Sequence, residues 1–306
     1  MFKYTLDNKR YYTLNYYNKI KYNSKVFKVG LNAGFSCPNK VNGKGCIYCY
    51  NGSGDNNGMD LVEQFYKVRS SIDKKWPNSK YIGYFQANTN TYDKVPVLKE
   101  RYEKILNLPN VIGLNIATRP DCLGEDILDY LEELNKKTNL VIEIGLQTIH
   151  EDTAKLINRG HTLNCFIDAV NNLRKRNIDV VVHIINGLPY ETKDIMLETV
   201  KFLSNLDIQG IKIHMLFITK GTELEELYNK EHFHILTREE YIDIVCDELE
   251  LLREDIVINR ITGDPESNLV IEPTWLLKKF CVLNEIDKEM LRRNSYQGIK
   301  YKKDSV

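Results

Sequence analysis

The chain has 306 residues, of which 42% are hydrophobic and 27% charged, and its 42 basic side chains balance its 42 acidic ones. This composition predicts a folded globular protein and excludes a disordered chain. No apolar run approaches the roughly 18 residues that a membrane span needs, so no membrane partner is expected. An odd number of cysteines, seven, without a recognisable targeting segment favours a cytoplasmic location over secretion.

Residues 1–25 are predicted to form a basic, aromatic-rich arm. The first thirty residues carry seven basic side chains and six tyrosines against a single acid, Asp7; the basic residues are Lys3, Lys9, Arg10, Lys19, Lys21, Lys25 and Lys28. Such an arm suits phosphate contact and base stacking on single-stranded nucleic acid. The alternative is that lysine and tyrosine are simply frequent in this sequence and carry no binding role.

Residues 26–221 are predicted to form a parallel sheet covered by helices, because short β-rich segments alternate with amphipathic helical ones. Apolar residues fall on one face of the predicted helices 123–137 and 162–176. Six such units favour an incomplete (β/α)6 barrel, whose site would lie at the carboxyl ends of the strands. The six predicted strands are Val26–Leu31, Tyr81–Gln86, Val111–Ala117, Leu140–Leu146, Val180–Asn186 and Gly210–Phe217.

Polar residues follow four successive strands of this predicted barrel. Gln86 to Tyr92 follow the second strand, Thr118 and Arg119 the third, Gln147 the fourth, and Gly187-Leu188-Pro189 the fifth. Each of these taken singly suits a turn or a helix cap. Together they favour a ligand pocket at one end of the barrel.

Residues 222–306 are predicted to be a helical and mixed extension that caps the open side of the barrel. The pattern indicates a helix over 237–253, a short strand over Asp255–Arg260, and a final helix over Pro273–Arg293.

Cys37, Cys46 and Cys49 form a C-x8-C-x2-C cluster within thirteen residues, with glycines between them. This pattern predicts a metal-binding loop, and three ligands where four are usual leave one coordination position open. The cluster alone favours iron–sulfur only slightly over zinc, although no second cysteine pair or histidine pair occurs at zinc-finger spacing. The other cysteines (Cys122, Cys165, Cys246 and Cys281) are expected to be small apolar groups.

These motifs together resemble the radical SAM enzymes, which use S-adenosylmethionine (SAM). The eight-residue first gap departs from the common C-x3-C-x2-C spacing, and it matches the YhcC-like bacterial branch, which is similar to the catalytic subunit of the tRNA-modifying Elongator complex. The matching stretches are Tyr11–Tyr17, Gly34–Asn39, Tyr84–Gln86, Thr89–Tyr92, Ala117–Asp121, Glu143–Thr148, Asn158–His161, Gly187–Pro189, Lys220–Thr222 and Arg260–Asp264.

The resemblance implies a partial radical SAM barrel with two cofactors. The three cysteines would hold a [4Fe–4S] cluster whose free iron binds SAM, and one electron would cleave SAM to a 5′-deoxyadenosyl radical. It also implies an electron donor of the flavodoxin or ferredoxin type.

The resemblance also assigns residue roles. The Tyr48 backbone would meet the adenine of SAM, while Gln147 and Arg159 would contact its ribose and carboxylate. Glu143 is a weaker SAM contact, because a structural carboxylate would also lie on a buried strand, and His183 is either a ribose contact or a core histidine. The remaining expected cofactor-binding residues are Gln86 and Thr118, and the residues considered for the chemistry are Asn90, Tyr92, Arg119 and His214.

By resemblance, the expected substrate is tRNA, whose wobble uridine would be converted from the carboxymethylaminomethyl to the aminomethyl form. A base splayed out of a loop is the form in which such a side chain can be reached. Two alternatives stay open: a radical SAM enzyme acting on a small metabolite, and a non-catalytic regulatory protein that binds the cluster and SAM.

Overall fold

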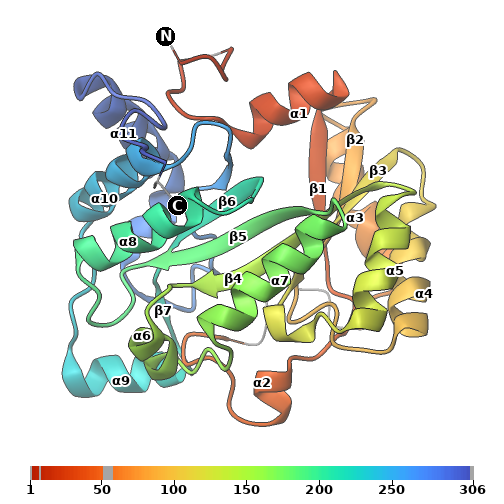
Figure 1. The fold of residues 1–306 in the computed structure, drawn as a ribbon, viewed down its shortest axis with the longest axis horizontal. Coiled ribbons are helices and arrows are strands. Elements are labelled where there is room, and N and C mark those ends of the chain that lie inside the picture. The colour runs from red at the N-terminus through yellow and green to blue at the C-terminus, as the bar shows by residue number, and fades with distance from the viewer. Residues whose placement is uncertain (1, 7, 51–57, 304–306) are drawn as a thin grey trace.

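The computed structural model describes residues 2–6, 8–50 and 58–303 and is built around one curled parallel sheet (Figure 1). Its seven strands lie in the order β1-β2-β3-β4-β5-β6-β8, each hydrogen-bonded in parallel to the next. They are β1 (Val26–Leu31), β2 (Lys80–Phe85), β3 (Val111–Thr118), β4 (Asn139–Gln147), β5 (Asp179–Asn186), β6 (Gly210–Met215) and β8 (Val257–Arg260). The predicted partial α/β barrel is therefore confirmed.

The barrel has seven strands where six were predicted. The six predicted strands agree with β1 to β6 within two residues at each end. The seventh, β8, is the short strand expected within the capping extension, and it pairs with β6 through Gly210–Val257 and Ile211–Ile258. The sequence pattern does not predict that β8 joins the sheet, because 41 residues of other structure separate it from the end of β6. No local βα pattern indicates their pairing.

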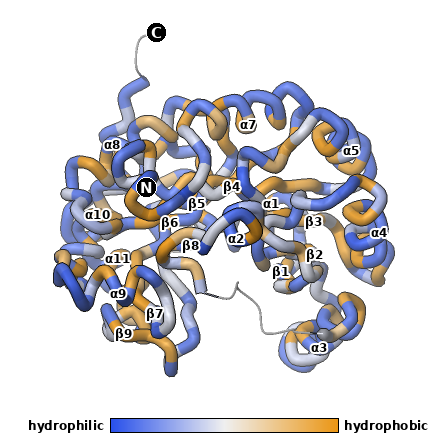
Figure 2. Tube along the Cα trace, turned by 90° about the horizontal axis from the view of Figure 1, so that it is seen from below, coloured by the Kyte–Doolittle hydropathy of each residue, from blue (hydrophilic) through white to orange (hydrophobic). Residues whose placement is uncertain are grey.

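Helices cover the outside of the sheet and leave its inner face to the barrel interior. Figure 2 shows α7, α5, α4 and α8 around the periphery, with the strands inside them. The covering helices are α3 (Leu61–Asp73), α4 (Val95–Leu106), α5 (Glu125–Asn135), α7 (Leu163–Lys175) and α8 (Lys193–Ser204). They bury the apolar faces expected from their periodicity, such as Phe166, Val170 and Leu173 of α7.

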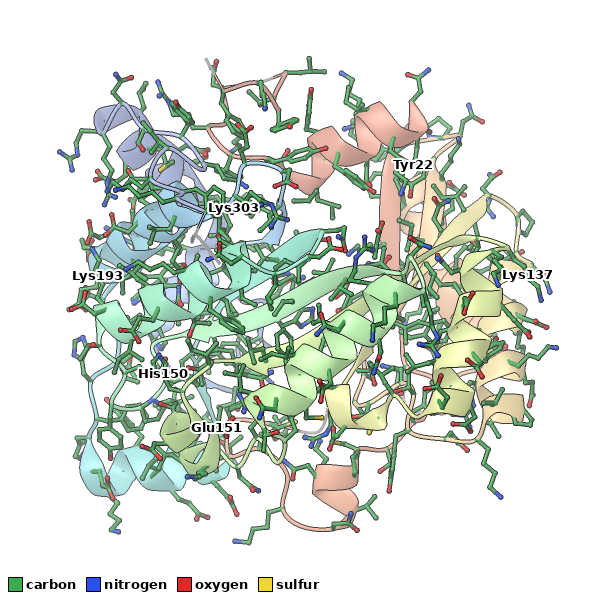
Figure 3. The ribbon with its side chains drawn as sticks, in the orientation of Figure 1. Tyr22, Lys137, His150, Glu151, Lys193 and Lys303 are labelled. Carbon is green, nitrogen blue, oxygen red and sulfur yellow. The ribbon has the colours of Figure 1, made fainter. Side chains whose placement is uncertain are left out.

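The basic arm packs against the carboxyl-terminal part of the chain. Thr13 caps the start of the arm's helix α1 (Leu14–Tyr22) and forms a parallel bridge with Ile258 of β8. Lys80 Nζ of β2 donates to the carbonyl of Tyr22, the last residue of α1. The arm thus lies over the seam between the two edge strands, at the end of the molecule opposite α2 (Pro38–Val41) (Figure 1). Figure 3 shows Tyr22, the last residue of α1, in the upper part of the view and Glu151, the first residue of α6, in the lower part.

Much of the arm's charge and aromatic surface is engaged within the chain. Lys3 pairs with Glu254 and Lys9 with Asp287. The Tyr4 ring stacks on Tyr12 with centroids 4.6 Å apart. The backbone N–H of Tyr12 donates to Gln297 Oε1 at 2.8 Å. These contacts favour a structural role for the arm, which would brace the barrel. Residues 1 and 7 of the arm lie outside the described part of the chain.

The remaining elements lie beside the barrel mouth and along one flank. Strands β7 (Ile218–Thr219) and β9 (Val270–Glu272) form a small antiparallel sheet. The others are η1 (Pro120–Cys122), α6 (Glu151–Leu156), α9 (Glu223–Glu231), α10 (Arg238–Leu251), η2 (Thr274–Lys278) and α11 (Lys279–Arg292). None of the helices in the described ranges is long and apolar enough to cross a membrane.

Helix α10 carries a carboxyl group that is buried without a cation. Glu248 is fully buried, and Asn186 Nδ2 at the end of β5 donates to its Oε2 at 2.9 Å. Burial raises the pKa of Glu248 to about 8, against the opposing effect of the Asn186 hydrogen bond. The folded protein therefore holds a proton on Glu248 at neutral pH.

Replacing Glu248 by Gln should stabilise the protein at alkaline pH. The folded pKa of Glu248 exceeds that of the unfolded chain, so the wild-type free energy of unfolding falls as the pH rises from about 4.5 to about 8. The Glu248→Gln variant lacks this loss and should gain about 4 kcal/mol relative to wild type between pH 5 and pH 9. Denaturant unfolding at both pH values measures the difference.

The matched control is Glu250→Gln on the same helix. Glu250 is also buried, but it pairs with Lys300 and lies 3.7 Å from Arg293. Its replacement should lower stability similarly at both pH values, because it removes one acid from the group that pairs with Arg293 and Lys300. Equal pH dependence of wild type and Glu248→Gln would contradict the assignment of a neutral Glu248.

Candidate functional site

A cavity of about 570 Å³ opens at the carboxyl ends of the strands, between the cysteine loop and the loops after β6 and β8. Most of the residues predicted to bind cofactors or to perform chemistry line it. They are Cys37, Cys46, Cys49, Tyr48, Gln86, Thr118, Arg119, Glu143, Gln147, Arg159, His183 and His214. Figure 2 looks toward this end of the barrel, with α2 near the centre of the view. The chain thus gathers residues from six strands of the main sheet, and from the loops that follow them, around one space.

The cysteine loop is fastened to two neighbouring segments through its backbone. Cys37 precedes the short helix α2 and accepts from the N–H groups of Lys40 and Val41 at 3.0 Å. Ile47 N–H donates to Ile157 O at 3.1 Å, and Ile47 O accepts from Leu224 N–H at 2.9 Å. The loop therefore bridges the end of α6 and the start of α9. The side chains of Ile47 and Tyr48 pack on a small apolar cluster that includes Ile157, Leu188 and Leu224.

The stretch Asn158-Arg159-Gly160-His161 holds the cysteine loop from the other side. Asn158 Nδ2 donates to Gly45 O at 2.6 Å, and Asn39 Nδ2 donates to Asn158 O at 2.6 Å and approaches Cys46 Sγ at 3.5 Å. Gly160 has a φ of +78°, and a Cβ there would lie 2.7 Å from Asn39 Oδ1. Only glycine fits this close approach.

Arg119 joins the same segments and uses most of its donors in doing so. Its guanidinium forms a bidentate pair with Asp121 at 2.9 and 2.7 Å. Nη1 donates to Arg159 O at 2.7 Å, and Nη2 to Gly160 O at 3.1 Å. These contacts make Arg119 a positioning residue for the loop next to the cysteines, and they leave little of it for substrate.

Arg159 is similarly committed to the protein. Its side chain is 1% exposed. Nη1 donates to Leu146 O at 3.1 Å and Thr148 O at 2.6 Å, Nε to His161 O at 2.9 Å, and Nη2 to Glu151 Oε1 at 3.2 Å. Since a guanidinium has five N–H donors, one remains for a ligand. Arg159 therefore fixes the end of β4, and its predicted contact with the SAM carboxylate stays a proposal for that one donor.

Two glutamines extend over glycines at the cavity wall. Gln147 has a φ of +65° at a register shift between β4 and β5. Its Nε2 lies 2.6 Å from where a Cβ of Gly145 would be. Gln86 is placed in the same way over Gly30, at 2.8 Å. Neither glutamine could take this position beside a larger residue, which explains both glycines.

A polar layer crosses the barrel below these glutamines, with one residue from every strand. The Glu143 carboxylate on β4 is fully buried at its centre. Oε1 accepts from Lys28 of β1 at 2.9 Å and Asn115 of β3 at 2.7 Å. Oε2 accepts from His183 of β5 at 2.8 Å and from Lys212 of β6.

The last two strands complete the layer. Lys212 Nζ of β6 also donates to the hydroxyl oxygen of Tyr84 on β2 at 2.8 Å, and Lys28 Nζ of β1 donates to Asn259 Oδ1 of β8 at 3.2 Å. All seven strands are therefore tied together inside the barrel.

The charges of this layer determine which groups are ionised. Burial opposes ionisation of Glu143, but the charges of Lys212 and Lys28 and the His183 hydrogen bond outweigh it and hold its pKa well below the usual range. Burial and the nearby Lys212 charge lower the pKa of His183 to about 4. Burial, reinforced by His183, holds the pKa of His214 well below its usual range. Both imidazoles are neutral at pH 7.

Two of the residues considered for the chemistry lie outside the cavity lining. Asn90 is fully buried, and its Nδ2 donates to the carbonyls of Phe85 at 3.0 Å and Ala117 at 2.8 Å. Tyr92 is 38% exposed and belongs to a separate surface depression with Pro38 and Asp121. Asn90 therefore joins the ends of β2 and β3, as a structural residue would.

The polar layer around Glu143, together with Arg260 beside it, forms the floor of the cavity, and sequence reasoning did not predict four of its residues. Lys28 was counted only among the basic residues near the start of the chain, Tyr84 and Arg260 were named only as parts of longer stretches, and Lys212 was not named. A signal was present, because Gly210-Ile211-Lys212-Ile213 places a lysine in the middle of an apolar strand. A lysine there must find a buried partner or face a polar cavity.

The comparisons with known proteins decide the family. A model of the radical SAM superfamily matches residues 32–203, and one of the radical SAM C-terminal domain matches residues 208–292. The chain belongs to the radical SAM superfamily. An uncharacterised protein of Bacillus subtilis, YtqA, is 49% identical over 304 residues, which cover 97% of this chain and 94% of YtqA. YhcC of Escherichia coli K12 is 30% identical over 285 residues, covering 91% of each chain. The predicted YhcC-like branch is therefore confirmed.

More distant similarity links this radical SAM chain to proteins named for tRNA. The tRNA uridine(34) acetyltransferase of Methanocaldococcus jannaschii is 24% identical over 201 residues, covering 63% of this chain and 37% of that protein. The solved structure of the archaeal Elp3 of Methanocaldococcus infernus superposes with a TM-score of 0.69 at 17% identity, over 90% of this chain and 64% of that one. The Elp3 likeness shows a shared fold.

The residues at the cavity fit the two cofactors of radical SAM enzymes, a [4Fe–4S] cluster and SAM. Cys37, Cys46 and Cys49 all line the cavity. Among the described residues, no three Cys, His, Asp or Glu side chains converge on one point as ligands of a single ion would. A [4Fe–4S] cluster suits more widely spaced thiolates, since each binds a different iron. The four other cysteines contribute nothing to the cavity lining.

Replacing any one of Cys37, Cys46 and Cys49 by Ala should abolish the cluster. Anaerobically reconstituted wild type is expected to hold about four irons per chain and to show broad thiolate-to-iron absorbance. Each variant should lose both, because no other thiolate lines the cavity to replace the missing ligand. Cys281→Ala is the control, since Cys281 is exposed on α11. A full cluster in any cavity variant would contradict the assignment.

Gly160→Ala should loosen the cysteine loop without removing a ligand. The new Cβ would displace Asn39. The alanine would also have to keep the left-handed backbone conformation of Gly160, which costs about 1–2 kcal/mol. Loss of iron to a chelator should therefore be faster than in wild type. Gly221→Ala is matched for φ, at +80°, but its Cβ would meet its nearest neighbour at an ordinary 3.8 Å. Equal rates of iron loss in both variants would show that backbone strain alone, and not the Asn39 contact, controls the loop.

Proposed function

We propose that this radical SAM enzyme modifies tRNA at the wobble uridine and converts its carboxymethylaminomethyl side chain to aminomethyl. The observation that carries the proposal is the similarity to a tRNA uridine(34) acetyltransferase over 201 residues, 63% of this chain. The fold shared with Elp3 supports it. In the proposed route a C–H bond of the carboxymethyl group next to nitrogen is broken, and the resulting carbon radical would return one electron to the cluster to give an imine. Water would then cleave the carbon–nitrogen bond, releasing the two carbons as glyoxylate and leaving the aminomethyl group. The first of these steps is a task for radical chemistry.

The cofactors supply a species able to abstract hydrogen, and the chain's own side chains orient and shield the reaction. Cys37, Cys46 and Cys49 would hold the cluster. The Tyr48 backbone and the two glutamines supported by glycines, Gln86 and Gln147, would contact SAM along the cavity wall.

The remaining assignments are also proposals. Thr118 bonds to Thr91 at 2.5 Å and would shape the wall after β3. Glu143 and His183 are engaged with each other at 2.8 Å, which favours a floor role for both over a ribose contact. His214 has no hydrogen-bond partner among the described residues and is left free to meet substrate.

The tRNA would approach the cavity mouth, and the basic arm would contribute only at a distance from it. Lys3 and Lys9 are paired with acids, whereas Lys19, Lys21 and Lys25 form no ion pair with the described residues. A tRNA is large enough to reach both ends of the molecule. An electron donor of the flavodoxin or ferredoxin type would dock where the cysteine loop reaches the surface at the exposed Cys49.

A radical SAM enzyme for a small metabolite is the second candidate. The cavity volume of about 570 Å³ lies within the usual range for small-molecule sites, roughly 300–1,000 Å³. The packed arm also weakens the sequence-based reason for expecting nucleic acid. A strong salt dependence of tRNA affinity would favour the first candidate over the second. Formation of 5′-deoxyadenosine separates both from a non-catalytic binding protein.

Cells that lack the protein should accumulate carboxymethylaminomethyluridine in tRNA and lose the aminomethyl form. Mass spectrometry of tRNA nucleosides measures both. Purified, reconstituted enzyme with SAM and a reductant should restore the aminomethyl form to that tRNA, and the Cys46→Ala variant should not. An unchanged nucleoside profile, together with no conversion in vitro, would contradict a tRNA substrate.

A further inference from the structure

The barrel floor carries more positive than negative charge. Lys28, Lys212 and Arg260 face or adjoin the cavity interior, and Glu143 is the acid of the polar layer. His183 and His214 add no charge at pH 7, as their surroundings keep them neutral. The lining also includes Asp264 and Glu266 on the loop after β8, both exposed, and Asp264 pairs with Lys279 at 2.9 Å. The cavity interior therefore has an excess of positive charge that an anionic group of a ligand would neutralise.

Glu143 cannot accept further hydrogen bonds from the spare donors of the lysines, because its acceptor sites are already occupied. Its two oxygens take four hydrogen bonds from four strands, and a carboxylate offers about four lone-pair sites. Lys212 donates to Glu143 and to Tyr84, and Lys28 donates to Glu143 and to Asn259. Each ammonium has three donors, so each retains one.

Arg260 has its whole guanidinium available. It is the last residue of β8, an edge strand of the sheet, and it lines the cavity while remaining exposed. In the ranges that the structure describes, it makes no hydrogen bond and no ion pair. Arg260 is the register partner of Lys212 on the neighbouring strand β6, and both residues line the cavity. An unpaired arginine beside a lysine with one donor to spare is suited to a carboxylate, which the planar guanidinium binds through two parallel hydrogen bonds.

We propose that Arg260 and Lys212 form the recognition site for a carboxylate on the substrate, which under the proposed function is the carboxymethyl group of the wobble side chain. This inference rests on the proposed function for the identity of the carboxylate. SAM also carries one, but Lys212 lies in the middle of β6, whereas the cysteine loop follows the carboxyl end of β1. The carboxylate site therefore lies deeper in the barrel than the loop that holds the cluster.

The test compares an acidic and a neutral substrate in wild type and in Arg260→Gln. The substrates are tRNA with the carboxymethylaminomethyl side chain and the same tRNA with its carboxylate converted to the primary amide. Arg260→Gln should raise KM for the acid about tenfold or more, the loss expected for a hydrogen bond between charged groups. It should leave the amide unaffected and so abolish the preference for the acid. Arg260→Lys should restore part of that preference.

Two controls separate this site from general electrostatics and from SAM binding. Lys303→Gln removes an equal charge outside the cavity lining and should leave the acid preference intact. The affinity for SAM and the cleavage of SAM without tRNA should be unchanged in Arg260→Gln. A fall in SAM affinity as large as the rise in KM would assign the site to the carboxylate of SAM and overturn the proposal. Equal effects on acid and amide would overturn it as well.

The proposed function can fail separately. If wild type converts neither tRNA, a wobble-uridine substrate is wrong. Equilibrium binding of the free nucleoside 5-carboxymethylaminomethyluridine and of its amide to the reconstituted enzyme with SAM then decides the carboxylate site. A preference for the acid that disappears in Arg260→Gln supports the site, and binding of acid and amide with equal affinity contradicts it.

Discussion

The buried carboxylate of Glu143 is the constraint on which the barrel interior depends. A carboxylate without water is costly unless it is paired and hydrogen-bonded, and here four strands each provide a donor. Removing one partner of such an arrangement typically costs about 3–5 kcal/mol, because the remaining charge stays buried. The strands are thereby held in a fixed register around a polar centre. The rest of the cavity is built above and beside that centre.

The two ends of the cavity have different physical characters. Its mouth is formed by backbone hydrogen bonds and by two arginines whose donors are almost fully used, so the cysteine loop is held rigidly. Its floor keeps spare donors on Lys212 and Arg260. A rigid mouth suits a cluster that stays bound in a fixed position, and a floor with unused donors suits a substrate that binds and is released. This division is consistent with a radical SAM enzyme in which cofactor and substrate occupy separate parts of one cavity.

The sequence predicted the strands and the cysteine loop well, because both leave local signals. Apolar runs mark β1 to β6, and closely spaced cysteines and glycines mark the loop. The pairing of β8 with β6 and the docking of the arm on Gln297 depend on contacts between distant segments. Those contacts have no periodicity of their own to detect. The contacts that engage most donors of Arg119 and Arg159 were not predicted either, since a motif identifies an arginine but cannot show which carbonyl groups its donors meet.

The most direct measurement is the fate of a deuterium label placed on the carboxymethyl methylene of the tRNA side chain. If the enzyme breaks the C–H bond next to nitrogen at this cavity, deuterium should appear in the 5′-deoxyadenosine formed from SAM, in step with the loss of the carboxymethyl group. Formation of 5′-deoxyadenosine without deuterium, at the same rate with and without tRNA, would contradict the account.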